Sequence, residues 1–183
     1  NPANIKWSRS LRNYVAKHEE FEYQTSGMTH SVSRPFSKMH VYFDRHLNHE
    51  RSRMPECFPT AAHDNLGYCV MSPRDAANFA TLATTAIPDL SIFVYASQFF
   101  PRWTWEPIES PEGELDFGMG ASEGSEPGTE GEILDGYRRV DNITDEILEV
   151  YREALGSDVT KDDIFYFVYG QLHDPGSVSY THL

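Results

Sequence analysis

The acidic segment from Glu109 to Asp135 constrains the fold of this chain more than any other feature. It holds nine acidic residues and no basic one, and glycine, serine, proline and glutamate dominate its composition. Apolar side chains are too sparse there for burial to offset the entropy that is lost when a chain becomes ordered. We therefore expect a mobile surface loop over residues 109–136, with folded structure on either side of it.

Before this loop, the sequence predicts two helices and three strands. Residues 5–11 place cations and apolar side chains at helical spacing and predict a short amphipathic helix. Residues 40–44 and 66–71 are rich in aromatic and β-branched side chains, which is typical of strands. A serine, a proline and an acidic residue open the helix that we expect over 72–86. A further strand is expected over 90–96.

After the loop, the pattern predicts two helices. The first follows Asn142 and ends at Gly156, and the second begins at Thr160, with Asp163 in the position of a capping box, and ends at Pro175. Their apolar stripes comprise Ile147, Leu148, Tyr151 and Leu155 in the first helix and Phe165, Val168, Tyr169 and Leu172 in the second. The expected fold class is α+β, a mixed sheet with flanking helices and a C-terminal helix pair.

The net charge of −13 is unevenly distributed along the 183 residues. Residues 1–60 carry nine Lys or Arg against six Asp or Glu, together with five of the eight histidines. Residues 61–183 carry six basic groups against 22 acidic ones. We therefore divide the chain into a basic segment, 1–60, and a second domain, 61–183, that contains the acidic loop.

The basic segment contains a cluster of cations interleaved with aromatic residues and histidines. Its members are Arg34, Lys38, Arg45, Arg51 and Arg53. Such a mixture suits contacts to phosphates combined with base stacking or readout of base edges, so these five are the candidate nucleic-acid-binding residues. The alternative is that some of them pair with Asp44, Glu50 and Glu56 on a solvated face, and the sequence leaves both interpretations open.

No motif in the chain indicates a catalytic centre or a cofactor site. The glycines at 118 and 120 lie in the acidic loop, where phosphate would be repelled. Cys57, His63 and Cys69 are residue types that bind zinc, but their spacing is poor, and we interpret both cysteines as buried thiols. Asp162 and Asp163 could serve a metal-dependent nuclease, although such runs are usually solvated surface. We expect no catalytic, metal or cofactor-binding residue in the chain.

The sequence also bears on localisation. No apolar run approaches the roughly 20 residues that a membrane span requires. Residues 1–12 do not read as a signal peptide. We expect a cytoplasmic chain with no membrane partner, in which the two cysteines stay reduced.

Several strings of the chain resemble type I-like single-polypeptide restriction-modification enzymes, which are often described as helicases. These strings are Ile5-Lys6-Trp7, Arg34-Pro35-Phe36-Ser37-Lys38, Val41-Tyr42-Phe43-Asp44, Phe58-Pro59-Thr60 ahead of Asn65, Pro88-Asp89-Leu90, Gln98-Phe99-Phe100-Pro101-Arg102 and the run from Lys161 to His173. The last run resembles a tyrosine-rich signature of that family. The order and spacing of the strings carry the resemblance over most of the chain.

The resemblance implies that residues 1–60 end a methyltransferase region and that residues 61–183 form a C-terminal specificity domain. The chain would then read double-stranded DNA while upstream modules methylate an adenine and cleave, using S-adenosylmethionine, ATP and magnesium bound elsewhere. The alternative is a protein-interaction module that couples the methyltransferase and helicase parts without touching DNA. No catalytic residue of the family matches a position in this chain.

Two features depart from the family pattern. The acidic loop is longer and more charged than the resemblance implies, and its field would oppose DNA unless it points away. Residues 178–183 resemble an in-frame translation of a transposase-adaptor end used in sequencing libraries, so we interpret them as a non-native artefact on a truncated fragment.

Overall fold

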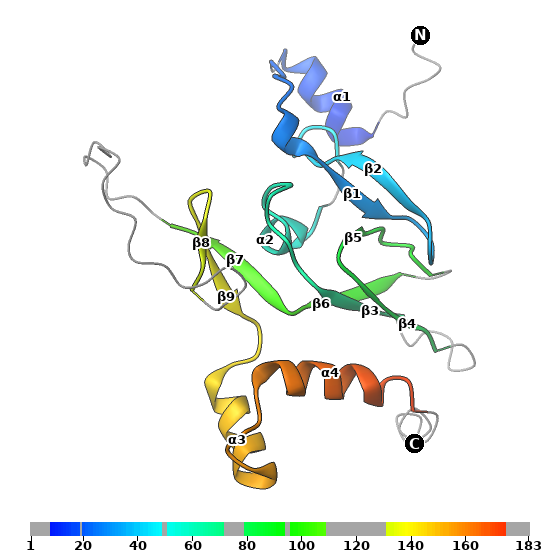
Figure 1. Cartoon of the computed structure of the whole chain (residues 1–183). Helices are drawn as coiled ribbons and strands as arrows, with labels where there is room; N and C mark the ends of the chain where they lie inside the picture. Colours follow the sequence, from blue (N-terminus) through cyan, green and yellow to red (C-terminus); the bar gives the residue numbers. More distant parts are fainter. Residues whose placement is uncertain are drawn as a thin grey trace, which may run out of the picture.

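Three small sheets and four α-helices make up the described part of the chain. The structure is a computed structural model, and it describes residues 8–18, 20–48, 51–71, 79–93, 96–108 and 131–174. Figure 1 shows the sheets between helix α1 at one end of the molecule and the helix pair α3 and α4 at the other. The helices are α1 (Arg9–Ala16), α2 (Met54–Cys57), α3 (Asp145–Leu155) and α4 (Lys161–Gln171), with a 3-10 turn at Thr25–Gly27.

The first sheet has the strand order β2-β1-β5. Strands β1 (Met28–Val32) and β2 (Lys38–Tyr42) form an antiparallel hairpin in which His30 lies opposite His40. Strand β5 (Ile87–Pro88) adds to β1 in the parallel direction, so this sheet is mixed, as expected for the α+β class. The pairing of β1 with β5 also joins residues on both sides of position 60. The domain boundary that we expect there from the sequence stays a prediction.

The second and third sheets are antiparallel. The second has the order β4-β3-β6, with strands β4 (Thr81–Thr84), β3 (Gly67–Met71) and β6 (Ser97–Pro101). The third has the order β7-β9-β8, with strands β7 (Trp103–Pro107), β9 (Tyr137–Asp141) and β8 (Ile133–Leu134). Only Arg102 separates β6 from β7, so the chain passes directly from one sheet to the next.

Several predictions from the sequence are confirmed. The strands expected over 40–44 and 66–71 correspond to β2 and β3 within a few residues. The C-terminal helix pair is present, and Thr160 and Asp163 form a complete capping box at the start of α4. Of the N-terminal helix predicted over 5–11, residues 5–7 lie outside the described residues. Helix α1 spans Arg9–Ala16, because Ser8 accepts a hydrogen bond from the Leu11 N–H and caps the helix there.

The helix predicted over 72–86 is wrong for its described part, since residues 81–84 form strand β4. Residues 72–78 lie outside the described residues. Four consecutive residues of β4 pair with β3, and the Thr81 hydroxyl donates to the Cys69 carbonyl at 3.0 Å. Pairing along a buried strand therefore outweighs the helix-start signal, and the threonines here favour a strand.

The strand predicted over 90–96 is also wrong for its described part, because residues 90–93 form a turn and β6 begins at Ser97, while residues 94–95 lie outside the described residues. The Asp89 carboxylate accepts the Ser91 N–H at 2.7 Å, and the Ile92 N–H donates to the Asp89 carbonyl at 3.0 Å. This local bonding by an aspartate competes with strand formation. Ile92 instead points into the core, where it is fully buried.

The end of the predicted acidic loop is structured as well. Residues 109–130 lie outside the described residues, but 131–136 form β8 and a tight turn into β9. Asp135 and Gly136 both have positive φ angles, 47° and 77°, which is the geometry of a two-residue hairpin turn. Glu132 also pairs with Arg139 at 2.8 Å, so this end of the segment is ordered by pairing rather than by apolar burial.

The apolar core lies where the first two sheets meet. One cluster contains Val32, Cys69 and Ile92, and a second contains Cys57, Phe58 and Ile87. The half-buried Phe99 packs against both clusters, so β6 links them. Val32 of β1 belongs to the first cluster, and Phe43, directly after β2, packs against the second, so the core supports the hairpin at both of these points.

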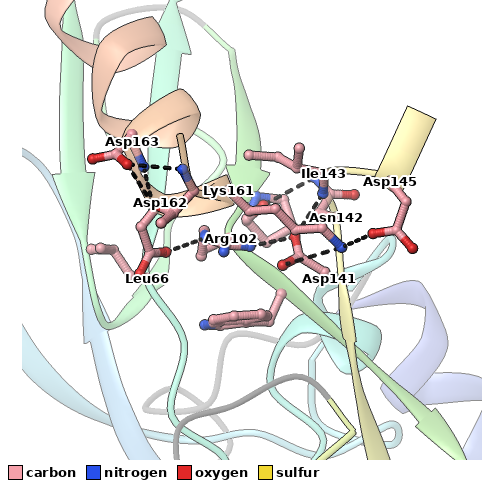
Figure 2. A network of polar contacts seen from close by, with 12 residues as sticks. Leu66, Arg102, Asp141, Asn142, Ile143, Asp145, Lys161, Asp162 and Asp163 are labelled. Atoms are coloured by element: carbon pink, nitrogen blue, oxygen red, sulfur yellow. Dashed lines mark hydrogen bonds and ion pairs between the residues drawn. The ribbon is translucent and has the colours of Figure 1, made fainter. Parts of the chain in front are cut away.

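A buried ion-pair network attaches the C-terminal helices to the sheets. Arg102 is 4% exposed, and its guanidinium pairs with the buried carboxylate of Asp141 on β9 and with Asp162 on α4, the latter at 2.7 Å. Figure 2 shows Arg102 between these two carboxylates. Lys161 lies 3.9 Å from Asp141 and 2.7 Å from Asp145. The β6–β7 junction, strand β9 and helices α3 and α4 therefore share one set of charges.

Trp103 completes this junction from the other side. The guanidinium of Arg102 lies 3.9 Å from the centre of the Trp103 ring, and that of Arg139 lies 3.8 Å from it. An aromatic face attracts a cation, and the attraction grows when water is excluded. The ring thus accommodates two like charges that would otherwise repel each other.

We predict that Gly67→Ala destabilises the fold by about 1–3 kcal/mol, as overpacking of a core does. A Cβ at this position would lie 2.3 Å from the Phe99 ring and 2.7 Å from the Phe100 carbonyl oxygen, and the backbone oxygen has little freedom to move. Urea denaturation would measure the free energy of unfolding. Gly170→Ala is the control, because a Cβ there meets no heavy atom within 4 Å in the described structure and a helical alanine stabilises by up to about 1 kcal/mol. Equal stabilities of the two variants would contradict the packing at β3.

We predict that Arg102→Met costs about 3–5 kcal/mol, because it leaves the buried Asp141 carboxylate without its main partner. The matched control is Arg53→Met, just before α2, whose side chain is 80% exposed and whose partner Glu56 lies 2.6 Å away. Removing such a surface pair changes the free energy of unfolding by at most about 1 kcal/mol. Similar losses in both variants, measured by urea denaturation, would show that the Arg102 network does not hold the fold together.

Candidate nucleic-acid interface

The hairpin β1–β2 forms a two-stranded ribbon with an unusual charge for this chain. From Tyr23 to Phe43, a stretch that contains both strands, there is no aspartate or glutamate, although the whole protein has 28 acidic residues. The ribbon carries Arg34, Lys38 and the ring pair of His30 and His40, whose centroids are 4.6 Å apart. A surface without acids is the part of this protein that can approach a polyanion at the least electrostatic cost.

The turn of the hairpin presents the first two predicted cations. Two backbone bonds close it, from the Ser33 N–H to the Ser37 carbonyl at 2.9 Å and from the Ser37 N–H to the Arg34 carbonyl at 3.3 Å. Arg34 and Lys38 are both exposed, and neither forms an ion pair with another described residue. Phe36 lies between them and is 89% exposed.

The other three predicted cations lie beyond the opposite end of β2. Arg45 donates from Nε to the His46 ring at 3.3 Å. The guanidinium of Arg51 lies 5.5 Å from the centre of the Phe43 ring. Arg53 pairs with Glu56 at 2.6 Å, which is the pairing that the alternative interpretation of the cluster expects, and the Glu56 carboxylate raises the pKa of Arg53.

The structure therefore divides the predicted cluster into two groups. Strand β2 has five residues, so the strand alone separates them by about 13 Å, at 3.3 Å for each of four steps. Figure 1 shows the turn of the hairpin at the end away from α1, the helix that lies near the second group. Whether either group contacts DNA stays a prediction.

Aromatic side chains hold the second group in place. The Tyr42 ring lies 5.7 Å from Phe21 and 5.2 Å from Tyr23, and its hydroxyl accepts the Gln24 N–H at 2.9 Å. Tyr14 of α1 packs edge-on against His46 at 4.6 Å. Tyr42, Phe21, Tyr23 and Tyr14 are thus occupied in packing.

Asp44 is the acid nearest in sequence to this end of the ribbon, and its carboxylate is engaged. It accepts the His46 N–H at 2.6 Å and contacts the His46 ring at 3.0 Å. Burial acts to raise the pKa of Asp44, but these bonds from His46 lower it overall. Asp44 pairs with the histidine rather than with an arginine, so it does not neutralise Arg45.

Three residues considered as zinc ligands have other roles. His63 is 2% exposed, with Nδ1 2.8 Å from the Thr60 hydroxyl and Nε2 3.1 Å from the Leu134 carbonyl. Burial raises the pKa of Cys57 to about 11 and of Cys69 to about 12, so both thiols stay protonated at neutral pH. Within the described ranges, no group of three or more His, Cys, Asp or Glu is placed to hold a metal ion.

Asn65 is a buried polar residue that sequence reasoning left without a role. Its amide donates to the carbonyls of Cys57 and Trp103, both at 2.9 Å, and so joins α2 to β7. Together with His63, it holds the loop that follows α2 against the third sheet. Its only signal in the sequence was its place after Phe58-Pro59-Thr60 in the family resemblance.

A hollow of about 280 Å³ lies beside the ribbon. Its lining includes His30 and Lys38 from the ribbon, Phe58 and Asp64 from the loop after α2, and Thr85.

None of the helices in the described part of the chain has the length and apolar character needed to cross a membrane.

Comparison with known proteins places this geometry in a family. A family model for the Type ISP C-terminal specificity domain matches residues 1–180. No curated protein matches the chain.

Solved structures give the same picture of the fold. The chain is 24% identical to the structure described as ATP-dependent Type ISP restriction-modification enzyme LlaBIII bound to DNA, with a TM-score of 0.72 over 97% of this chain and 10% of that one. For the DrdV-DNA complex the identity is 22% and the TM-score 0.73, over 96% and 15%. For a nuclease-deletion mutant of the Type ISP enzyme LlaGI in complex with a DNA substrate mimic, the values are 26% and 0.64, over 95% and 12%. The chain thus spans only between 10% and 15% of the length of these proteins.

Proposed function

The chain belongs to the family of Type ISP C-terminal specificity domains, and we propose that it recognises the DNA target of a longer restriction-modification enzyme. The observation that carries this proposal is the acid-free ribbon β1–β2, which bears exposed cations in a protein with a net charge of −13. A chain that is acidic overall repels DNA unless its charges are segregated. The ribbon provides the segregated surface that phosphate contact requires.

The dimensions of the ribbon suit DNA. The major groove is about 12 Å wide and admits a two-stranded β-ribbon as well as a helix. The two groups of cations lie about 13 Å apart along β2, so they can reach phosphates on either side of a groove while the strand between them faces base edges. In this arrangement Arg34, Lys38, Arg45 and Arg51 position the domain, and Arg53 contributes less because Glu56 already neutralises it.

The solved structures that this chain resembles support the proposal. LlaBIII is described as bound to DNA, DrdV as a DNA complex and LlaGI as in complex with a DNA substrate mimic. Each is a much longer protein than this chain. We propose that the chain is the target-reading part of such a protein and that it works in the cytoplasm.

Catalysis belongs, in this proposal, to modules that precede the chain in the longer protein. Adenine methylation with S-adenosylmethionine, and helicase and nuclease action with ATP and magnesium, would take place there. This chain would direct the chemistry to a site on DNA without taking part in it.

The helix pair suggests a second role, that of coupling to the upstream modules. Val150 and Leu155 of α3 are 64% and 69% exposed, and Tyr166 and Phe167 of α4 are 58% and 52% exposed. Helix α3 carries Asp145 and Glu146 in its first turn, and α4 carries Asp162 and Asp163, so these helices are unsuited to DNA. Binding of the chain to an isolated upstream module in the absence of DNA would support this role.

We predict that replacing Arg34 and Arg45 with alanine weakens DNA binding and its salt dependence. Each lost phosphate contact lowers the slope of log K against log salt by about 0.9, so the double variant should lose about 1.8 in slope. Fluorescence anisotropy with a random-sequence duplex, at several salt concentrations, would measure it. The control is Arg138→Ala/Arg152→Ala, which removes the same charge from β9 and α3 and should leave most of the slope in place. Equal losses in the two variants would contradict binding through the ribbon, and no binding by the folded parent would favour the coupling role.

A further inference from the structure

Phe36 is an apolar side chain with no cover in the described structure. At 89% it is the most exposed of the large hydrophobic side chains in the described ranges, and it forms no ring or cation contact there. An isolated exposed phenylalanine gains nothing from burial in its own fold. Its position at a hairpin turn, the most accessible point of the ribbon, therefore leaves it available for contact with a binding partner.

The backbone of the turn holds this side chain outward at some energetic cost. Arg34 and Phe36 have φ angles of 71° and 70°, in the left-handed region that residues with a side chain rarely adopt. Such conformations persist where the surroundings enforce them, and they cluster at ligand-binding sites. Here the two backbone bonds between Ser33, Arg34 and Ser37 enforce the turn, so Phe36 is presented by a closed loop.

The charge around Phe36 identifies the partner. The cations Arg34 and Lys38 flank it two residues away on each side, and no acid occurs between Tyr23 and Phe43. Asp89 belongs to the chain segment next to the end of β1, where its N–H donates to the Val32 carbonyl, and its carboxylate accepts the Ser91 N–H. An apolar ring between two free cations is complementary to a nucleotide, which offers a flat base beside a phosphate.

We propose that Phe36 stacks on a base of the bound DNA, as an aromatic wedge at the tip of the ribbon, while Arg34 and Lys38 contact the phosphates on either side. This inference rests on the proposed function, and it adds a residue that recognises DNA through base stacking rather than through charge. Phenylalanine is one of the side chains that proteins insert between base steps. Because every base has an apolar face, this contact provides affinity and local unstacking but little sequence preference.

Phe36→Ala tests the wedge separately from the phosphate contacts. Stacking of one base on an aromatic side chain is worth about 1–3 kcal/mol, so we expect Kd to rise roughly 5- to 150-fold. The slope of log K against log salt should stay unchanged, since both cations remain. Leu155→Ala on α3 removes an apolar side chain that is 69% exposed from the far end of the molecule, and it should bind as the parent does.

Two further measurements identify the stacking itself. A duplex with one abasic site costs less to unstack, so the parent should bind it more tightly than the intact duplex and Phe36→Ala should lose that preference. Phe36→Trp should bind as the parent does, and its extra tryptophan emission should be quenched by DNA.

The outcomes separate this proposal from the one on which it rests. If Phe36→Ala binds as tightly as the parent with the usual salt dependence, the wedge is wrong and the proposed function stands. If the parent itself does not bind DNA, both fail. If light scattering shows that the parent is a dimer and Phe36→Ala a monomer, the occupant of this tip is a second copy of the chain, and the wedge is again wrong.

Discussion

The buried guanidinium of Arg102 is the interaction on which the rest of the architecture depends. Arg102 stands between β6 and β7, so its backbone joins two sheets while its side chain reaches β9 and α4. A buried charge is tolerated only when partners surround it, which the two carboxylates and the Trp103 ring do here. The requirement for all of these partners at once sets the relative positions of sheets and helices.

This junction also separates the two surfaces of the protein. Helices α3 and α4 lie on one side of it, and the acid-free ribbon lies on the other side, next to α1 and with its turn directed away from α1 (Figure 1). A polyanion bound to the ribbon therefore lies at a distance from the helix pair. Beyond about 10 Å, salt screens most of the electrostatic repulsion between the polyanion and the acidic helices. The net charge of the chain consequently says little about the field at either surface.

The sequence was informative where local chemistry decides the structure. The capping box of Thr160 and Asp163, the apolar content of residues 66–71 and the division of charge along the chain all act over short range. The sequence did not predict structure that depends on residues far away along the chain. Residues 81–84 form a strand because β3 lies beside them, and the partners of Arg102 are 39 and 60 residues away. One local signal was available and missed, since Asp135-Gly136 is a typical two-residue hairpin turn.

For the candidate interface, the sequence identified the cations, but only the strand between them shows that they form two groups.

The way β1 joins the sheets affects the order in which the parts fold. The hairpin β1–β2 closes through a five-residue turn, whereas its contact with β5 pairs Ser31 with Ile87, far along the chain. Closing a long loop costs more entropy than closing a short one, so local pairs tend to form first. The ribbon is thus built from contacts that are available before residues 87–88, which pair with it, have been synthesised. A nascent chain would expose its most cationic surface while most of its acidic residues are still untranslated.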